Sequence, residues 1–152
     1  PVVKPIHETR DCPPLTVLES NPTLLAQLSE YEQKKYASLT VLQNEYTWNR
    51  YASEFLPGIK QVDRTLFHRV RENYALDIHP FTDEKVFSKP LLIFLGRQDN
   101  VVGFRDQLEL LSQFPHASVV LLDRAGHNLP AEQPDIFTSH TIGWLENISK
   151  FF

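Results

Sequence analysis

The chain has 152 residues, of which 41% are hydrophobic and 11% aromatic, so it carries enough apolar surface for one folded domain with a sizeable core. Its 15 basic and 19 acidic residues give a formal net charge of -4 without any basic run, which disfavours a nucleic-acid partner. The longest apolar runs, at residues 91–95 and 119–122, are far shorter than the roughly 20 residues that span a bilayer, so no membrane association is expected.

Cysteine and methionine usage add two expectations. Cys12 is the only cysteine, which excludes an internal disulfide and favours a reducing, cytoplasmic location. No basic residue adjoins Cys12 to activate its thiol, so we interpret it as a loop residue without a chemical role. The chain contains no methionine and begins at Pro1, which indicates a processed, truncated or partly observed protein.

The first half of the chain predicts helices. Residues 1–14 are rich in proline and should be irregular, whereas Asn21 before Pro22 is a good start for a short helix. Ser29 and Glu32 have the spacing of a capping box, which predicts a second helix from residue 30 to about residue 42.

Two further helices complete this region. Trp48, Tyr51 and Phe55 repeat at helical spacing, and Pro57-Gly58 should end that helix. Residues 59–70 begin another helix, which should fade near residue 73. The pattern predicts an all-α lid of four short helices without strands.

The composition changes after about residue 81, where a charged linker that contains proline precedes the first predicted strand. This change places a boundary at residues 83–89. Residues 91–95 and 119–122 are apolar at every position, as in parallel strands covered on both faces. Between them a crossover helix is expected, which makes a right-handed βαβ unit. The apolar positions of that helix are Val102, Leu108, Leu111 and Phe114. A last helix should begin at residues 133–135 and turn Phe137, Thr141, Trp144, Leu145 and Ile148 inward.

Asp99 and His127 each follow one of the predicted strands. Parallel strands present their carboxyl ends at one edge of the sheet, where open α/β sheets place their active sites, so the two side chains should lie near each other. An aspartate there can orient a histidine for proton transfer, or can simply cap the helix that begins near Val101. A loop histidine can likewise be a proton-transfer group or make only a local hydrogen bond.

A hydrolytic triad also needs a nucleophile, which usually sits in a Gly-X-nucleophile-X-Gly turn. Two places after the five glycines stand Lys60, Gln98, Arg105, Asn128 and Leu145, so the chain contains no such turn. The sequence supplies two members of a triad without the third.

The motifs GRQD followed by VVG, and DRAGHN followed by EQP, resemble the carboxyl-terminal part of the α/β-hydrolase family. The resemblance covers roughly the last 65 residues with specific motifs, and residues 1–84 resemble the family's helical cap less specifically. It implies an α/β fold with a helical cap at residues 1–84 and the carboxyl-terminal βαβα part of the hydrolase core at residues 85–152. Asp99 then matches the family's acid and His127 its histidine.

The resemblance implies a complete protein that cleaves a small apolar ester, thioester or related bond, including a carbon–carbon bond, through a covalent intermediate. This chain alone should be inactive, and the alternative is an inactive, truncated binding module. In both cases the open edge of the sheet should meet the amino-terminal half of the same protein or a second copy of the chain.

Several other residues have types that could serve a role. Asp123 is the alternative acid, and Arg124 and Glu132 should form or cap local structure, with substrate contact as the lesser reading. Trp48, Tyr51 and Phe55 could line an apolar substrate pocket, although an aromatic stripe at helical spacing is more often core. The remaining histidines show no metal-ligand spacing, so neither a metal nor a cofactor is expected. These are His7, His68, His79, His116 and His140.

Overall fold

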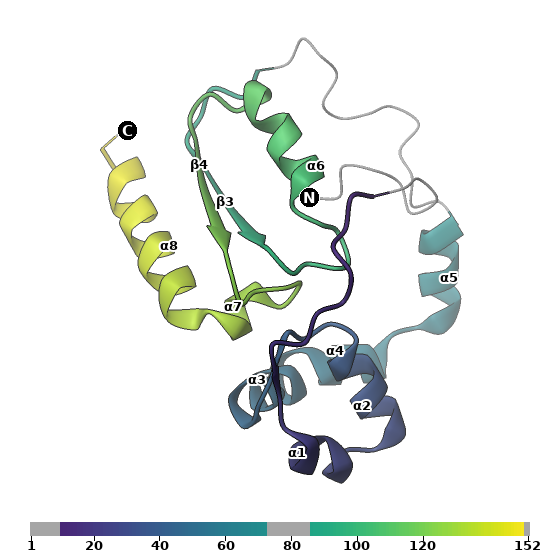
Figure 1. Cartoon of the computed structure of the whole chain (residues 1–152). Coiled ribbons are helices and arrows are strands. Elements are labelled where there is room, and N and C mark those ends of the chain that lie inside the picture. Colours follow the sequence, from purple (N-terminus) through teal and green to yellow (C-terminus); the bar gives the residue numbers. More distant parts are fainter. Residues whose placement is uncertain (1–9, 73–85, 151–152) are drawn as a thin grey trace.

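A computed structural model describes residues 10–72 and 86–150. The described chain forms a helical region, residues 10–72, and a βαβα region, residues 86–150 (Figure 1). The helical region lies beyond the end of the sheet where α7 (Leu129–Glu132) begins. Within the described residues, no helix is long and apolar enough to cross a membrane.

The helical region starts as its sequence predicts. Asn21 caps α1 (Pro22–Gln27) by accepting a hydrogen bond from the Leu24 N–H, and Ser29 and Glu32 form the expected capping box at the start of α2 (Glu30–Ala37). Helix α2 ends at Ala37, so the prediction of a helix to residue 42 is wrong.

The prediction that this region contains no strands is also wrong. Two short strands, β1 (Glu19–Ser20) and β2 (Leu42–Gln43), pair in parallel. The apolar spacing that suggested a helix through residue 42 instead reflects the burial of Val41 and Leu42 in the chain that leaves α2.

The third correction concerns Pro57. Helix α3 (Glu45–Arg50) continues through a π-helical turn, η1 (Tyr51–Phe55), into α4 (Leu56–Gln61), which contains both Pro57 and Gly58. A proline is tolerated at a helix start because its missing N–H needs no partner there, and the π-helical turn resets the hydrogen bonding so that Pro57 stands at that position. The chain breaks later, at Val62, before α5 (Arg64–Glu72).

The core of the helical region is aromatic. Tyr36, Tyr51 and Leu56 are buried together, and Trp48 packs against Tyr36 with ring centroids 5.3 Å apart. The hydroxyl of Tyr36 lies 2.7 Å from that of Thr47. The polar end of Tyr36 is therefore tied to the start of α3, whereas the buried hydroxyl of Tyr51 has no hydrogen-bond partner among the described residues.

Strands β3 (Leu91–Gly96) and β4 (Ala117–Leu122) pair in parallel, as predicted, with Ile93 opposite Val119. The crossover between them is α6 (Arg105–Leu108) followed by a 3-10 helix, η2 (Glu109–Gln113). The crossover begins three residues later than Val102, because residues 99–102 form a turn around the Asp99 carboxylate. The pair β3–β4 lies between α6 and α8 (Pro134–Ile148) (Figure 1).

The described residues bury the strand pair β3–β4 only in part. Leu95 is buried, but residues 91–94 are only half-buried, because β3 pairs with β4 alone among the described strands. Phe94 packs against Phe137 of α8, as the inward face of that helix predicts, with ring centroids 4.7 Å apart. Leu145 was predicted to face inward and is instead 50% exposed.

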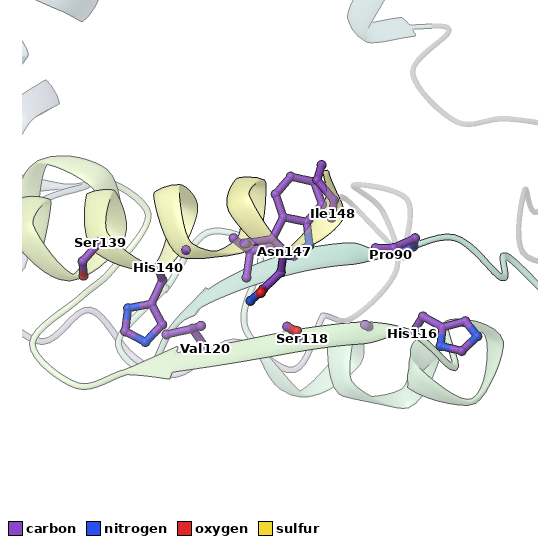
Figure 2. Close-up of a pocket in the computed structure, with 12 residues that line it drawn as sticks. Pro90, His116, Ser118, Val120, Ser139, His140, Asn147 and Ile148 are labelled. Atoms are coloured by element: carbon purple, nitrogen blue, oxygen red, sulfur yellow. The ribbon is translucent and has the colours of Figure 1, made fainter. Parts of the chain in front are cut away.

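An open groove of about 710 Å³ lies between α8 and the β3–β4 pair. Figure 2 shows side chains from both elements lining it, including His140 on α8 and Ser118 and Val120 on β4. No carboxylate is among the described residues that line the groove, so His140 has no acid partner there. The Nδ1 of His140 instead lies 2.9 Å from the Ile136 carbonyl oxygen within the same helix.

The predicted boundary at residues 83–89 lies partly outside the described residues, as do residues 1–9 of the leading segment. The division into residues 1–84 and 85–152 stays a prediction.

Candidate active site

Asp99 occupies the turn that follows β3. Its Oδ1 accepts hydrogen bonds from the backbone N–H groups of Val101 at 2.9 Å and Val102 at 3.0 Å. The residue is only 7% exposed. These contacts are those of a capping aspartate, and they use one oxygen only, so Oδ2 remains for another partner.

That partner is His127, in the turn that follows β4. Its Nδ1 lies 3.3 Å from Asp99 Oδ2, and the imidazole is 39% exposed. The parallel pairing of β3 and β4 therefore brings the two side chains together at one edge of the sheet, as expected. Asp99 therefore contacts His127, as one alternative predicted, whereas the other alternative, a cap on a helix that begins near Val101, is wrong, because residues 100–102 form a turn and α6 begins at Arg105.

The protonation of Asp99 follows from its surroundings. Burial acts to raise its pKa, but the hydrogen bonds from His127 and from the Val102 and Val101 N–H groups outweigh burial, so the pKa lies below its ordinary value. An ionised carboxylate only accepts hydrogen bonds, so Nδ1 of a neutral His127 carries the proton. Its Nε2 is then the nitrogen able to accept a proton from a reacting group.

The His127 loop (residues 126–128) is anchored to the helical region on both sides of the histidine. The Gly126 N–H donates to Glu132 Oε2 at 2.5 Å, and the Val41 N–H donates to Glu132 Oε1 at 2.6 Å. Asn128 Nδ2 donates to Thr40 Oγ1 at 3.2 Å. Glu132 was expected to form local structure, and it does so at Gly126, but its bond to Val41 spans 91 positions of sequence.

The loop also packs closely on the end of β3. A methyl group placed on Gly96 would lie 2.5 Å from the Gly126 carbonyl oxygen and 2.6 Å from that of Ala125. Any side chain at Gly96 would therefore displace the His127 loop. Glycine at this position allows the two turns to approach, a requirement that the sequence alone did not reveal.

A cavity of about 190 Å³ adjoins Asp99 and His127. Most of its described lining is apolar, including Phe94, Leu95, Val102, Leu129 and Pro130. Besides Asp99 and His127, Gln107 from α6 is a polar residue of the lining. Its side chain is buried, and its Oε1 has no hydrogen-bond partner among the described residues. The cavity thus has a mainly apolar surface beside a histidine and its acid.

Asp123 is placed differently from Asp99. Its Oδ1 accepts a hydrogen bond of 2.7 Å from Gln98 Nε2, whose side-chain oxygen in turn accepts from the Ala125 N–H at 3.2 Å. The bond from Gln98 is the main cause that holds the pKa of Asp123 below its ordinary value. Asp123 is therefore part of the frame of the loop, and Asp99 is the carboxylate that faces His127.

The remaining predicted residues take structural contacts. Arg124 pairs with Glu19 at 3.3 Å and has a positive φ of 56°. Tyr51 is buried and stacks between Trp48 and Phe55 at centroid distances of 5.9 and 6.0 Å. None of these three aromatic residues is among the described lining of the cavity at His127. Their role in substrate binding stays a prediction.

A metal ion needs a set of ligands from side chains that lie close together. Among the described residues, no three His, Cys, Asp or Glu side chains gather in an arrangement that could hold a metal ion. The chemistry that this site can support is proton transfer by an imidazole that contacts an ionised carboxylate.

Comparisons with known proteins agree with this architecture. No protein-family model matches the sequence, and no curated protein matches it closely enough to count as a relative. The crystal structure of an α/β superfamily hydrolase from Oenococcus oeni PSU-1 superposes with a TM-score of 0.84 at 24% sequence identity. The match covers 98% of this chain and 55% of that chain, so the chain spans about half the length of that hydrolase. The chain therefore has an α/β fold that matches part of that hydrolase, with a helical region before the β3–β4 pair.

Proposed function

We propose that the chain is the cap and carboxyl-terminal part of an α/β-hydrolase that cleaves a small apolar ester, thioester or related bond. The observation that carries the proposal is the contact between His127 Nδ1 and Asp99 Oδ2 at the ends of adjacent parallel strands. We use "complete hydrolase" for the assembly of this chain with the part that supplies the nucleophile.

In the proposed mechanism, Nε2 of His127 accepts the proton of the nucleophile as the nucleophile attacks the carbonyl carbon of the substrate. The same nitrogen then returns the proton to the leaving group. Asp99 does not take the proton. It holds Nδ1–H, keeps the tautomer correct and stabilises the imidazolium while that charge exists.

The apolar preference rests on the cavity beside His127. Its described lining is mainly hydrocarbon, which favours a small acyl or alkyl group over a charged one. The cap aromatics Trp48, Tyr51 and Phe55 are proposed to extend this apolar surface. The choice among ester, thioester and carbon–carbon bonds depends on groups that the nucleophile-bearing part would supply.

The test is hydrolysis of p-nitrophenyl acetate and butyrate by this chain and by the complete hydrolase. The chain alone should give no rate above buffer, because His127 and Asp99 have no nucleophile to activate. The complete hydrolase should turn over both esters and lose that activity in His127→Ala. Turnover by the chain alone that disappears in His127→Ala would refute the proposal that the nucleophile lies elsewhere.

A second candidate function is a binding module without turnover. The observation that favours it is the lack of any Gly-X-nucleophile-X-Gly turn in the sequence, together with an unpaired edge of β3 among the described strands. A Gly-X-Ser-X-Gly stretch in the same open reading frame or in a co-purifying chain favours the hydrolase. Its absence favours the binding module.

A further inference from the structure

Glu132 has an unusual position for a carboxylate. It is 5% exposed, and no basic side chain among the described residues forms an ion pair with it. Burial is the main cause that raises its pKa above the ordinary value, against the hydrogen bonds that it accepts from backbone N–H groups. A group that is costly to bury needs a structural reason to be there.

The two carboxylate oxygens of Glu132 bind two different segments of the chain. Oε2 accepts from Gly126, the residue immediately before His127, and Oε1 accepts from Val41, the residue immediately before β2. The carboxylate therefore bridges two segments that have no other covalent or strand connection nearby. One segment carries the proposed catalytic histidine, and the other belongs to the helical region.

A second contact joins the same two segments on the far side of His127. Asn128 Nδ2 donates to Thr40 Oγ1 at 3.2 Å, and both residues are buried. The packing is also tight, since a methyl group on Gly126 would lie 2.6 Å from Val41 Cγ2. The backbone on each side of His127 is thus fixed against residues 39–42, and the buried carboxylate is the charged member of that contact.

We propose that Glu132 is a positioning residue, which holds the His127 loop against residues 39–42 and so fixes the imidazole relative to Asp99 and the substrate. This inference rests on the proposed function. Through Glu132 the helical region helps to orient the catalytic base, in addition to any role in covering the substrate.

The proposal predicts a specific kinetic pattern in the complete hydrolase. Glu132→Ala should lower kcat about 10- to 100-fold with KM changed less than about twofold, because a displacement of about 1 Å at the reacting group has an effect of that size. Glu132→Gln keeps one acceptor oxygen and the side-chain volume, so it should recover part of the lost kcat. Asp106→Asn is the matched control. It also removes a buried charge that accepts a backbone N–H, from Asp11 at 3.2 Å, and should leave kcat within about twofold.

A second measurement does not need turnover. In this chain, amide hydrogen exchange followed by NMR should show faster exchange at Gly126 and Val41 in Glu132→Ala, and the ring signals of His127 should shift. Asp106→Asn should change none of these signals. This arm separates the two proposals: retained turnover in His127→Ala would refute the proposed function, while the exchange data would still judge the role of Glu132.

The outcomes that overturn the inference are equally definite. A folded Glu132→Ala variant with kcat within twofold of the unmodified protein would do so. An equal loss of kcat in Asp106→Asn would do so as well, since it would mark a general stability effect. If Glu132→Ala does not fold, Glu132→Gln decides, and failure of both to fold would assign Glu132 a structural role only.

Discussion

Asp99 joins two functions in one side chain. One oxygen caps the turn after β3 through Val101 and Val102, and the other faces His127. The cap fixes the carboxylate before any ligand arrives, so its position relative to the imidazole does not depend on the substrate. One side chain can therefore both stabilise the turn after β3 and contact the imidazole of His127.

The lowered pKa of Asp99 predicts how stability depends on pH. Burial opposes ionisation, but the hydrogen bonds from His127 and the two N–H groups prevail, so the folded state holds the proton more weakly than the unfolded state. The stabilisation is present above the unfolded pKa of about 3.9 and is lost as the pH falls through the lower folded pKa. Asp99→Asn should therefore be less stable than the unmodified chain at pH 7, with a difference that shrinks below about pH 4.

Urea unfolding of both proteins at pH 7 and pH 3 measures this difference. Asp123→Asn serves as the comparison, because Asp123 is an exposed carboxylate that contacts Gln98 instead of His127. A gap between Asp99→Asn and the unmodified chain that is equal at both pH values would show that the ionised carboxylate contributes nothing to folding.

At the residue scale, the sequence predicted the contact that follows from strand order, but it did not predict contacts that depend on tertiary packing. Asp99 and His127 could be predicted as neighbours because each follows an apolar strand, and parallel pairing fixes where strands end. The bond from Val41 to Glu132 could not be predicted, because it joins residues 91 positions apart and leaves no periodic pattern. The same holds for Gly96, whose need to lack a side chain appears only when the loop beside it is seen.

At the scale of helices and strands, tertiary packing overrides local helical propensity at two places in the helical region. Pro57 and Gly58 would end a regular helix, yet both lie in the first turn of α4. The π-helical turn η1 shifts the backbone hydrogen-bond register before them. Residues 38–42 continue the apolar spacing of α2 but leave the helix to pair with β1. Both corrections fall in the helical region, where short elements take their limits from tertiary packing, whereas β3, β4 and α8 follow the predicted limits within a few residues.

The junction between β3 and the His127 loop gives a test of element packing. Gly96→Ala should destabilise the chain by about 1–3 kcal/mol, because its methyl group would meet two carbonyl oxygens closer than 3 Å. Gly143 in α8 is the matched control, since nothing lies within 4 Å of a methyl group placed there. Gly143→Ala should instead stabilise by about 0.5–1 kcal/mol. Thermal unfolding of the two variants decides, and equal effects would contradict the close approach at Gly96.

On the scale of the whole molecule, the βαβα region presents surface that suits a further layer of protein. Ile142 and Leu145 on α8 are 51% and 50% exposed, and β3 has an unpaired edge among the described strands. We propose that the nucleophile-bearing part of the hydrolase, or a second copy of the chain, covers this surface.

Light scattering at several concentrations, combined with intact mass, tests that proposal. The purified chain should self-associate or carry a second polypeptide, because an apolar strand with a free edge recruits another strand. A monomer of 17.6 kDa with no companion chain and cooperative unfolding would show that the edge needs no cover.

The central claim is that His127 and Asp99 are the base and acid of a hydrolase, and kcat for ester hydrolysis by the complete hydrolase tests it most directly. His127→Ala and Asp99→Asn should each lower kcat at least about 100-fold while the protein stays folded, because each removes one part of the proton-transfer pair. Asp123→Asn should change kcat far less, since that carboxylate contacts Gln98. Equal losses in Asp123→Asn and Asp99→Asn, or full activity in His127→Ala, would contradict the account.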